Sequence, residues 1–191
     1  VSLLTVPVFV FFLLYAEEVI VFLFTDAYRG SALIFAIYLC SIPMELFVYG
    51  HIHQAFGATR HIFWANFVGL PLTILLNIVF HSLFGFVGPA IAWVVTKFLT
   101  IFYHLAIIKG YFSVSFRRVF PWSHWGKVLG LCLTAGALVY PLKWTGAPIV
   151  VILALSAAIY TGAYIFLIER CGYLSFSYKE MIKGRISPAP S

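Results

Sequence analysis

The chain consists of long apolar segments separated by short breaks of polar residues and glycine. Six such segments cover approximately residues 1–24, 31–56, 62–80, 86–108, 128–142 and 148–168. A helix that crosses a membrane needs about 20 mostly apolar residues. The pattern therefore predicts an all-α fold class, a polytopic helical bundle with about six transmembrane helices in a membrane domain over residues 1–170.

The connections between these segments are short, except for 109–127, KGYFSVSFRRVFPWSHWGK. Its aromatic and basic residues are typical of a segment at the membrane interface, with rings at headgroup depth and cations near lipid phosphates. Nucleic-acid-binding segments use the same residue types, but the neighbouring spans hold this one at a bilayer. We therefore expect membrane lipids as partners and no nucleic acid. The basic tail, 171–191, ends in SPAPS and is predicted to be disordered at its end.

Composition excludes a soluble protein. Hydrophobic residues make up 63% of the 191 residues, charged residues 9%, and the mean hydropathy is +1.03, whereas soluble domains are about 25% charged. The three cysteines are scattered and form no CxxC pair, which argues against a disulfide framework. The chain starts at Val1, already inside an apolar run, and we expect it to be a C-terminal fragment of a longer protein.

Charge predicts the orientation of the chain in the membrane. If the spans alternate, the outer side carries only Arg29 and Lys143, and Lys97 lies within a span. The other nine basic residues fall together on the opposite side: Arg60, Lys109, Arg117, Arg118, Lys127, Arg170, Lys179, Lys183 and Arg185. Because positive charge accumulates in cytoplasmic loops, the C-terminus and the 57–61 turn are predicted to be cytoplasmic.

Two ionisable residues lie near the middle of predicted spans, Glu45 in 31–56 and Lys97 in 86–108. A charged group at the bilayer centre costs about 2.5–3.5 kcal/mol on insertion scales and commonly marks a functional path. Both spans begin on the outer side, so the two residues should lie at similar depth. They are predicted to line a water-accessible cavity and to pair there, or alternatively to form a structural ion pair between two helices.

Helical phase adds histidines to these polar faces. At 100° per residue, His53 lies about 80° from Glu45, and His104 lies about 20° from Lys97. Trp93 and Thr100 are also near Lys97. A polar face of this kind turns toward a bundle interior or a cavity, although a single membrane histidine serves equally well as a hydrogen-bonded structural residue.

The stretch GHIHQAFGATRH, 50–61, holds three histidines but does not predict a metal site. His51 and His53 lie about 200° apart on a helix, and the helical zinc spacing HExxH is absent. We interpret the stretch as a helix end, a turn at Gly57 and the start of the next helix, with His51 in packing. Motifs of hydrolases and nucleotide-binding enzymes are also missing, so we expect no enzyme, no catalytic residues and no cofactor.

Three stretches together resemble bacterial polysaccharide flippases. They are YAEEVIVFLFTDAYRGSALIF (15–35), QAFGATR (54–60) and LLNIVFHSLFGFVGPAIAWVV (75–95), in the family's order and spacing. The chain resembles the C-terminal part of an O-antigen or exopolysaccharide repeat-unit flippase, of the superfamily of multidrug, oligosaccharidyl-lipid and polysaccharide transporters. The resemblance covers 1–108, and 109–170 by topology alone. Thr25 stands where the family prefers glycine, and Pro89 where it prefers alanine.

The resemblance implies part of the C-terminal lobe of a flippase with 12–14 helices. It implies alternating-access transport of a polyprenyl-diphosphate-linked oligosaccharide across the bacterial cytoplasmic (inner) membrane, coupled to an ion gradient and in contact with other polysaccharide-assembly proteins. From depth and phase, Lys97, Arg60 and His104 are the candidates for substrate binding, and Glu45 and His53 for ion coupling.

Three alternatives remain open from the sequence. A drug or cation antiporter of the same superfamily would need more acidic cavity residues, and Lys97 argues against it. A membrane subunit of a polysaccharide-synthesis pathway, such as a glycosyltransferase or polymerase, would need a large outward loop. A truncated lobe without transport activity is the third.

Overall fold

The computed structural model describes residues 2–45, 49–112 and 122–171, and every regular element in these ranges is a helix. The predicted all-α fold is therefore confirmed. The elements are α1 (Ser2–Leu14), α2 (Ala16–Phe24), η1 (Asp26–Ser31), α3 (Ala32–Leu39), α4 (Ile42–Glu45), α5 (Tyr49–Ala55), α6 (Arg60–Phe84), η2 (Gly85–Val87), α7 (Gly88–Phe112), α9 (Trp122–Val139), η3 (Tyr140–Trp144) and α10 (Ile149–Arg170).

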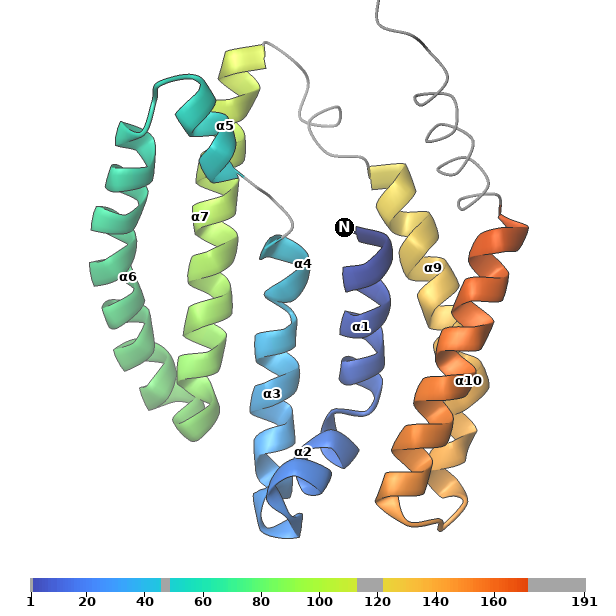
Figure 1. The fold of residues 1–191 in the computed structure, drawn as a ribbon. Helices are drawn as coiled ribbons and strands as arrows, with labels where there is room; N and C mark the ends of the chain where they lie inside the picture. Colours follow the sequence, from blue (N-terminus) through green and yellow to red (C-terminus); the bar gives the residue numbers. More distant parts are fainter. Residues whose placement is uncertain (1, 46–48, 113–121, 172–191) are drawn as a thin grey trace, which may run out of the picture.

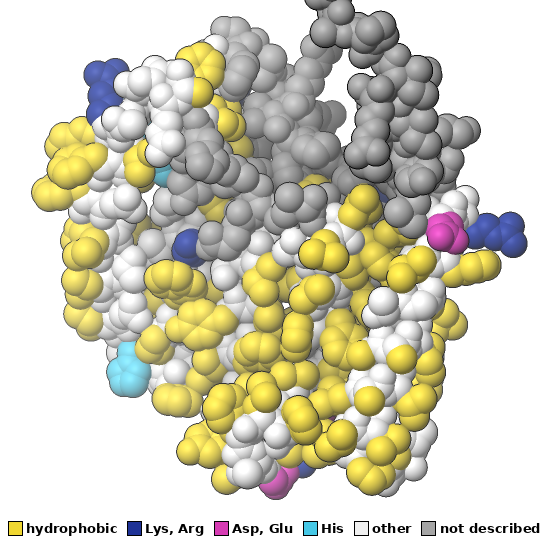
Figure 2. Space-filling view, viewed as in Figure 1, with side chains coloured by type: hydrophobic (Ala, Val, Ile, Leu, Met, Phe, Trp, Pro, Cys, Tyr) yellow, Lys and Arg dark blue, Asp and Glu magenta, His cyan; other side chains and the backbone are white. Residues whose placement is uncertain are grey.

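The long helices stand side by side in a row (Figure 1). The helix α6 forms one edge and packs on α7, α7 packs on α3, α3 on α1, and α1 on α9, which contacts α10. The helices α6 and α7 are antiparallel, and α3 and α7 begin at the same end of the bundle (Figure 1). Among the described residues, most of the side chains on the face shown in Figure 2 are hydrophobic, as expected of helices that face lipid.

Three stretches of the described chain are long and apolar enough to cross a membrane: Arg60–Tyr111, Trp125–Trp144 and Ile149–Arg170. A fourth is the pair Leu3–Leu14 and Ala16–Phe24, taken together as one span that is bent by 76°. The first stretch contains both α6 and α7. Each of these has 25 residues, or about 37 Å at 1.5 Å per residue, and each alone exceeds the bilayer core of about 30 Å.

The predicted span 31–56 is not one continuous helix in the structure. The chain forms α3, α4 and α5 in succession, and residues 46–48 lie outside the described range. The predicted linker and tail lie mostly outside it as well: α7 continues to Phe112, α9 already begins at Trp122, and 172–191 are not described.

The bend between α1 and α2 brings an ion pair to one end of the bundle. Lys143 Nζ lies 3.0 Å from Glu18 Oε1 and donates a 2.9 Å hydrogen bond to the carbonyl of Leu14. The rings of Tyr15 and Tyr140 both lie near the same ammonium, each with its centroid at 5.4 Å. Lys143 therefore holds the C-terminal end of α1 by binding the carbonyl of Leu14 and the carboxylate of Glu18 at the same time.

The turn after α2 lies at one of the two positions where the chain departs from the pattern that it resembles. Thr25 has φ +90°, and in the described chain it alone among residues other than glycine has a positive φ. A side chain with a Cβ is strained in this region, which glycine adopts freely. The glycine that the resembling family prefers here therefore fits the backbone better than threonine does.

The hydrophobic core lies among α1, α2, α9 and α10, and buried tyrosines lock its helices together. Pro7, inside α1, has no N–H to donate to the carbonyl of Leu3, four residues earlier. The hydroxyl of Tyr164 on α10 donates to that carbonyl at 2.7 Å, and the hydroxyl of Tyr160 donates to the carbonyl of Pro7 at 3.1 Å. In lipid an unsatisfied backbone carbonyl is costly, so α10 completes the hydrogen bonding of α1.

Candidate functional site

A polar cavity lies between α6 and α7, away from the hydrophobic core. Its volume is about 420 Å³. The lining residues are Ala65, Asn66, Gly69, Leu70, Thr73, Ile74, Trp93, Thr96, Lys97 and Thr100. Lys97 is half-buried, with Nζ 5.1 Å from the centroid of the Trp93 ring. A cation therefore stands beside an aromatic face midway along two apolar helices.

Small residues on α6 create this space. Ala65, Gly69 and Thr73 follow one another at intervals of four and share one face of the helix. A Cβ built on Gly69 meets nothing within 4 Å, so the space beside it is open. The hydroxyl of Thr73 donates to the carbonyl of Gly69 at 2.7 Å, and that of Thr96 to Ala92 at 2.9 Å. Both hydroxyls keep lone pairs with which they can accept a hydrogen bond from a ligand.

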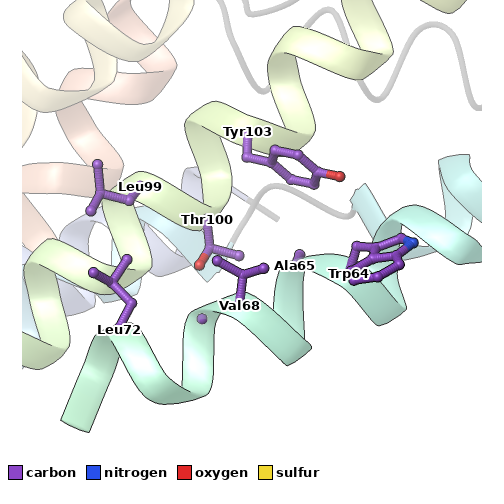
Figure 3. Close-up of a pocket in the computed structure, with 8 residues that line it drawn as sticks. Trp64, Ala65, Val68, Leu72, Leu99, Thr100 and Tyr103 are labelled. Carbon is purple, nitrogen blue, oxygen red and sulfur yellow. The ribbon is translucent and has the colours of Figure 1, made fainter. Parts of the chain in front are cut away.

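A second cavity of about 190 Å³, which has no charged lining residue, adjoins the first one (Figure 3). Ala65, Gly69 and Thr100 line both cavities. In Figure 3, Tyr103 extends from α7 and Trp64 from α6 at one end of this cavity, and Thr100 lies opposite Val68. The α6–α7 pair thus offers a cationic space and an apolar space next to each other.

A histidine pair lies nearer the other end of α7, where α5 packs on it. His53 Nε2 and His104 Nδ1 are 2.9 Å apart, and His53 Nδ1 lies 3.2 Å from the hydroxyl of Tyr111. The two histidines are almost completely buried, with exposed fractions of 0% and 1%. The ring of His61, at the start of α6, lies 5.9 Å from that of His53, and its Nδ1 is 3.4 Å from the hydroxyl of Tyr103.

The structure places the predicted residues in different surroundings. Lys97 lines the polar cavity. His104, expected on the face of Lys97, contacts His53 instead. Arg60 is exposed at the start of α6, five residues before Ala65, the first residue of α6 that lines the cavity, and so about 8 Å along the helix from it. Glu45 ends α4, which packs against α7, but its side chain lies outside the described residues, so its pairing with Lys97 stays a prediction.

Sequence reasoning missed several members of the site. The turn at Gly57, predicted from the sequence, has φ +63°, but it also brings His61 back toward His53. The side chain of His51, expected in packing, lies outside the described residues. Tyr111 was included in the predicted linker, although its spacing of seven residues from His104 places both on one face of a continuing helix. Among the described residues, no three or more His, Cys, Asp or Glu side chains are grouped to hold a metal ion.

Comparison with known proteins gives a likeness of fold. No protein-family model and no curated protein matches the sequence. A solved structure of the lipid II flippase MurJ, in an inward closed conformation, is similar over 95% of this chain, with a TM-score of 0.70 and 20% sequence identity. The chain spans 37% of the length of that flippase. The chain therefore has an all-helical membrane fold similar to that of part of this protein.

Proposed function

We propose that this chain is part of a transporter that moves a polyprenyl-diphosphate-linked oligosaccharide across the bacterial cytoplasmic membrane by alternating access. The observation that carries the proposal is the cavity between α6 and α7, where Lys97 stands beside Trp93 between two apolar helices. The likeness in fold to a lipid II flippase supports it. No covalent step, cofactor or catalytic residue is needed for this transport.

The proposed substrate combines a diphosphate with a long apolar chain, and the cavity provides for the charge. An anion taken from water into a site of low dielectric needs a charged hydrogen-bond donor. Lys97 is that donor, and Asn66 and Thr100 in the same cavity add polar contacts. Arg60 is proposed as a second cation at the cytoplasmic mouth, with the C-terminus on the same side. Glu45 and His53 remain the candidates for ion coupling, and His104 stays a candidate cavity residue by sequence alone.

Binding distinguishes this function from that of a cation antiporter. The full chain, reconstituted in lipid nanodiscs, is titrated with farnesyl diphosphate and with the apolar cation tetraphenylphosphonium. We expect farnesyl diphosphate to bind more tightly, and Lys97→Ala to weaken it about tenfold or more, because a charge-assisted hydrogen bond contributes about 1.5–3 kcal/mol. Lys97→Arg should retain binding, and Lys127→Ala, at an exposed lysine of α9, serves as the matched control.

Tighter binding of tetraphenylphosphonium would favour the antiporter, and unchanged binding in Lys97→Ala would remove this residue from the site. Transport itself is tested in bacteria that lack their repeat-unit flippase, complemented with the complete reading frame that contains this chain. Restoration of surface polysaccharide by wild type and by Lys97→Arg, but not by Lys97→Ala, is the expected result.

A further inference from the structure

The geometry of the contact between His53 and His104 limits how many protons the two imidazoles can hold. Two neutral imidazoles can share one N–H between Nε2 of His53 and Nδ1 of His104, which are 2.9 Å apart. If His53 donates this hydrogen bond, its Nδ1 is free to accept one from the hydroxyl of Tyr111 at 3.2 Å. Each polar atom along the line from Tyr111 to His104 then has a partner, with no net charge.

The same heavy-atom positions accept one additional proton. If the proton binds Nδ1 of His53, the hydroxyl of Tyr111 turns and accepts the hydrogen bond that it previously donated, because a phenol serves in either role. His53 then donates through both ring nitrogens, to Tyr111 and to His104. The positive charge is spread over two hydrogen bonds, and neither distance has to change.

A second proton is incompatible with this contact. It would have to bind Nδ1 of His104, and two N–H groups would then face each other across 2.9 Å. Two imidazolium rings with centroids 4.9 Å apart also repel, strongly in surroundings of low dielectric. The ring contacts that the structure gives for the pair bring no carboxylate: His61 contributes a third imidazole from α6, and Tyr103 and Tyr111 contribute phenols from α7.

Other titratable or charged groups on the packed elements are exposed, line the polar cavity, as Lys97 does, or lie outside the described residues. Tyr38 on α3 and Cys40, just after α3, are exposed. Arg60 at the start of α6 and Lys109 on α7 are exposed as well. The side chain of Glu45 on α4, which packs on α7, lies outside the described residues.

We propose that His53 and His104 form a proton-binding site that holds one proton between α5 and α7, and that a second proton separates the two helices. The site takes its protons from water and involves no other reactant. The proposal goes beyond the transport function and rests only on the geometry of the described side chains, so it stands or fails independently of the transported substrate.

Proton occupancy is measured by solid-state NMR of the imidazole nitrogens, on the full chain labelled with 15N at histidine and reconstituted in lipid bilayers. The pH is varied between about pH 8 and pH 4, the range around the ordinary imidazole pKa. We expect the His53 and His104 signals to change together in a first step of one proton, as coupled groups do. In His53→Gln or His104→Gln, the remaining histidine should titrate alone. Tyr111→Phe removes the acceptor for the additional proton and should move the first step to lower pH.

Helix separation is measured as the distance between two spin labels by electron paramagnetic resonance. The labels are attached at Ala55→Cys on α5 and Gly110→Cys on α7, in a chain whose natural cysteines are replaced. The distance should stay constant through the first step and increase in the second, and it should be independent of pH in His53→Gln. His81→Gln, at an exposed histidine near the far end of α6, is the control and should behave like wild type. Independent titration of the two rings, absence of any protonation down to pH 4, or a distance that never changes would overturn the proposal.

Discussion

The hydroxyl of Tyr164 is predicted to stabilise the bundle because Pro7 leaves a carbonyl without a partner. Tyr164→Phe keeps the ring, which is only 7% exposed, and removes the 2.7 Å hydrogen bond to the carbonyl of Leu3. A buried acceptor left unsatisfied costs about 1–3 kcal/mol, and we expect the free energy of unfolding to fall by that amount. Tyr160→Phe is a related control, since its hydroxyl bonds the carbonyl of residue 7 rather than that of residue 3.

The decisive measurement is a double-mutant cycle with Pro7→Ala. An alanine at position 7 supplies the N–H that the helix lacks, so the carbonyl of Leu3 gains an intrahelical partner and Tyr164→Phe should become nearly neutral. The coupling between the two positions should be about 1–2 kcal/mol, while the cost of Tyr160→Phe should be the same in both backgrounds. Unfolding is followed by circular dichroism as SDS is added to mixed micelles. An equal cost of Tyr164→Phe with proline and with alanine at position 7 would refute the reasoning.

Three further predictions concern the ends of the bundle and the cavity. Lys143→Met should lower the free energy of unfolding by about 3 kcal/mol in the same assay, because it leaves the carboxylate of Glu18 unpaired. Arg29→Met breaks only exposed ion pairs and should cost under about 1 kcal/mol. Equal costs of the two substitutions would contradict this prediction. Thr25→Gly should stabilise the chain by about 1 kcal/mol, because glycine adopts the positive φ at this position without strain. Thr145→Gly, at φ −72°, should destabilise the chain. A loss of stability in Thr25→Gly would show that no strain is stored there. Gly69→Val should fill the polar cavity and weaken binding of farnesyl diphosphate at least tenfold with little change in stability, and unchanged affinity would place the ligand elsewhere.

Apolar segments in the sequence predicted the class of fold and most of the helices, because lipid imposes their length and composition. The bend after α1 was not predictable in detail, since Glu17 and Glu18 interrupt the apolar run just after Tyr15 but do not by themselves fix the angle between two helices. The same holds for the division of 31–56 into short helices. What bends these segments is their packing partners, such as Lys143, which lies more than a hundred residues away from Glu18.

Within the candidate site, residue type alone pointed to a cavity residue, whereas helical phase predicted only in part which side chains lie together. Lys97 stood out because a lysine is rare in a span. His104 shares its face by angle, but seven residues along an α-helix amount to about 10 Å, far enough to meet α5 instead of the cavity. The residues that form the cavity wall, Ala65 and Gly69, gave no signal because small residues are common wherever membrane helices pack.

The tight α6–α7 hairpin has a consequence for how the chain enters the membrane. Only η2 connects the two helices, and a Cβ on Gly88 would collide with the backbone of Phe80, so their contact begins directly at the turn. Contacts this local in sequence form early. The pair is therefore suited to insert during synthesis as one unit, in which Lys97 already lies against the small residues of α6. The residue that is most costly to expose to lipid would then never cross the bilayer on an isolated helix.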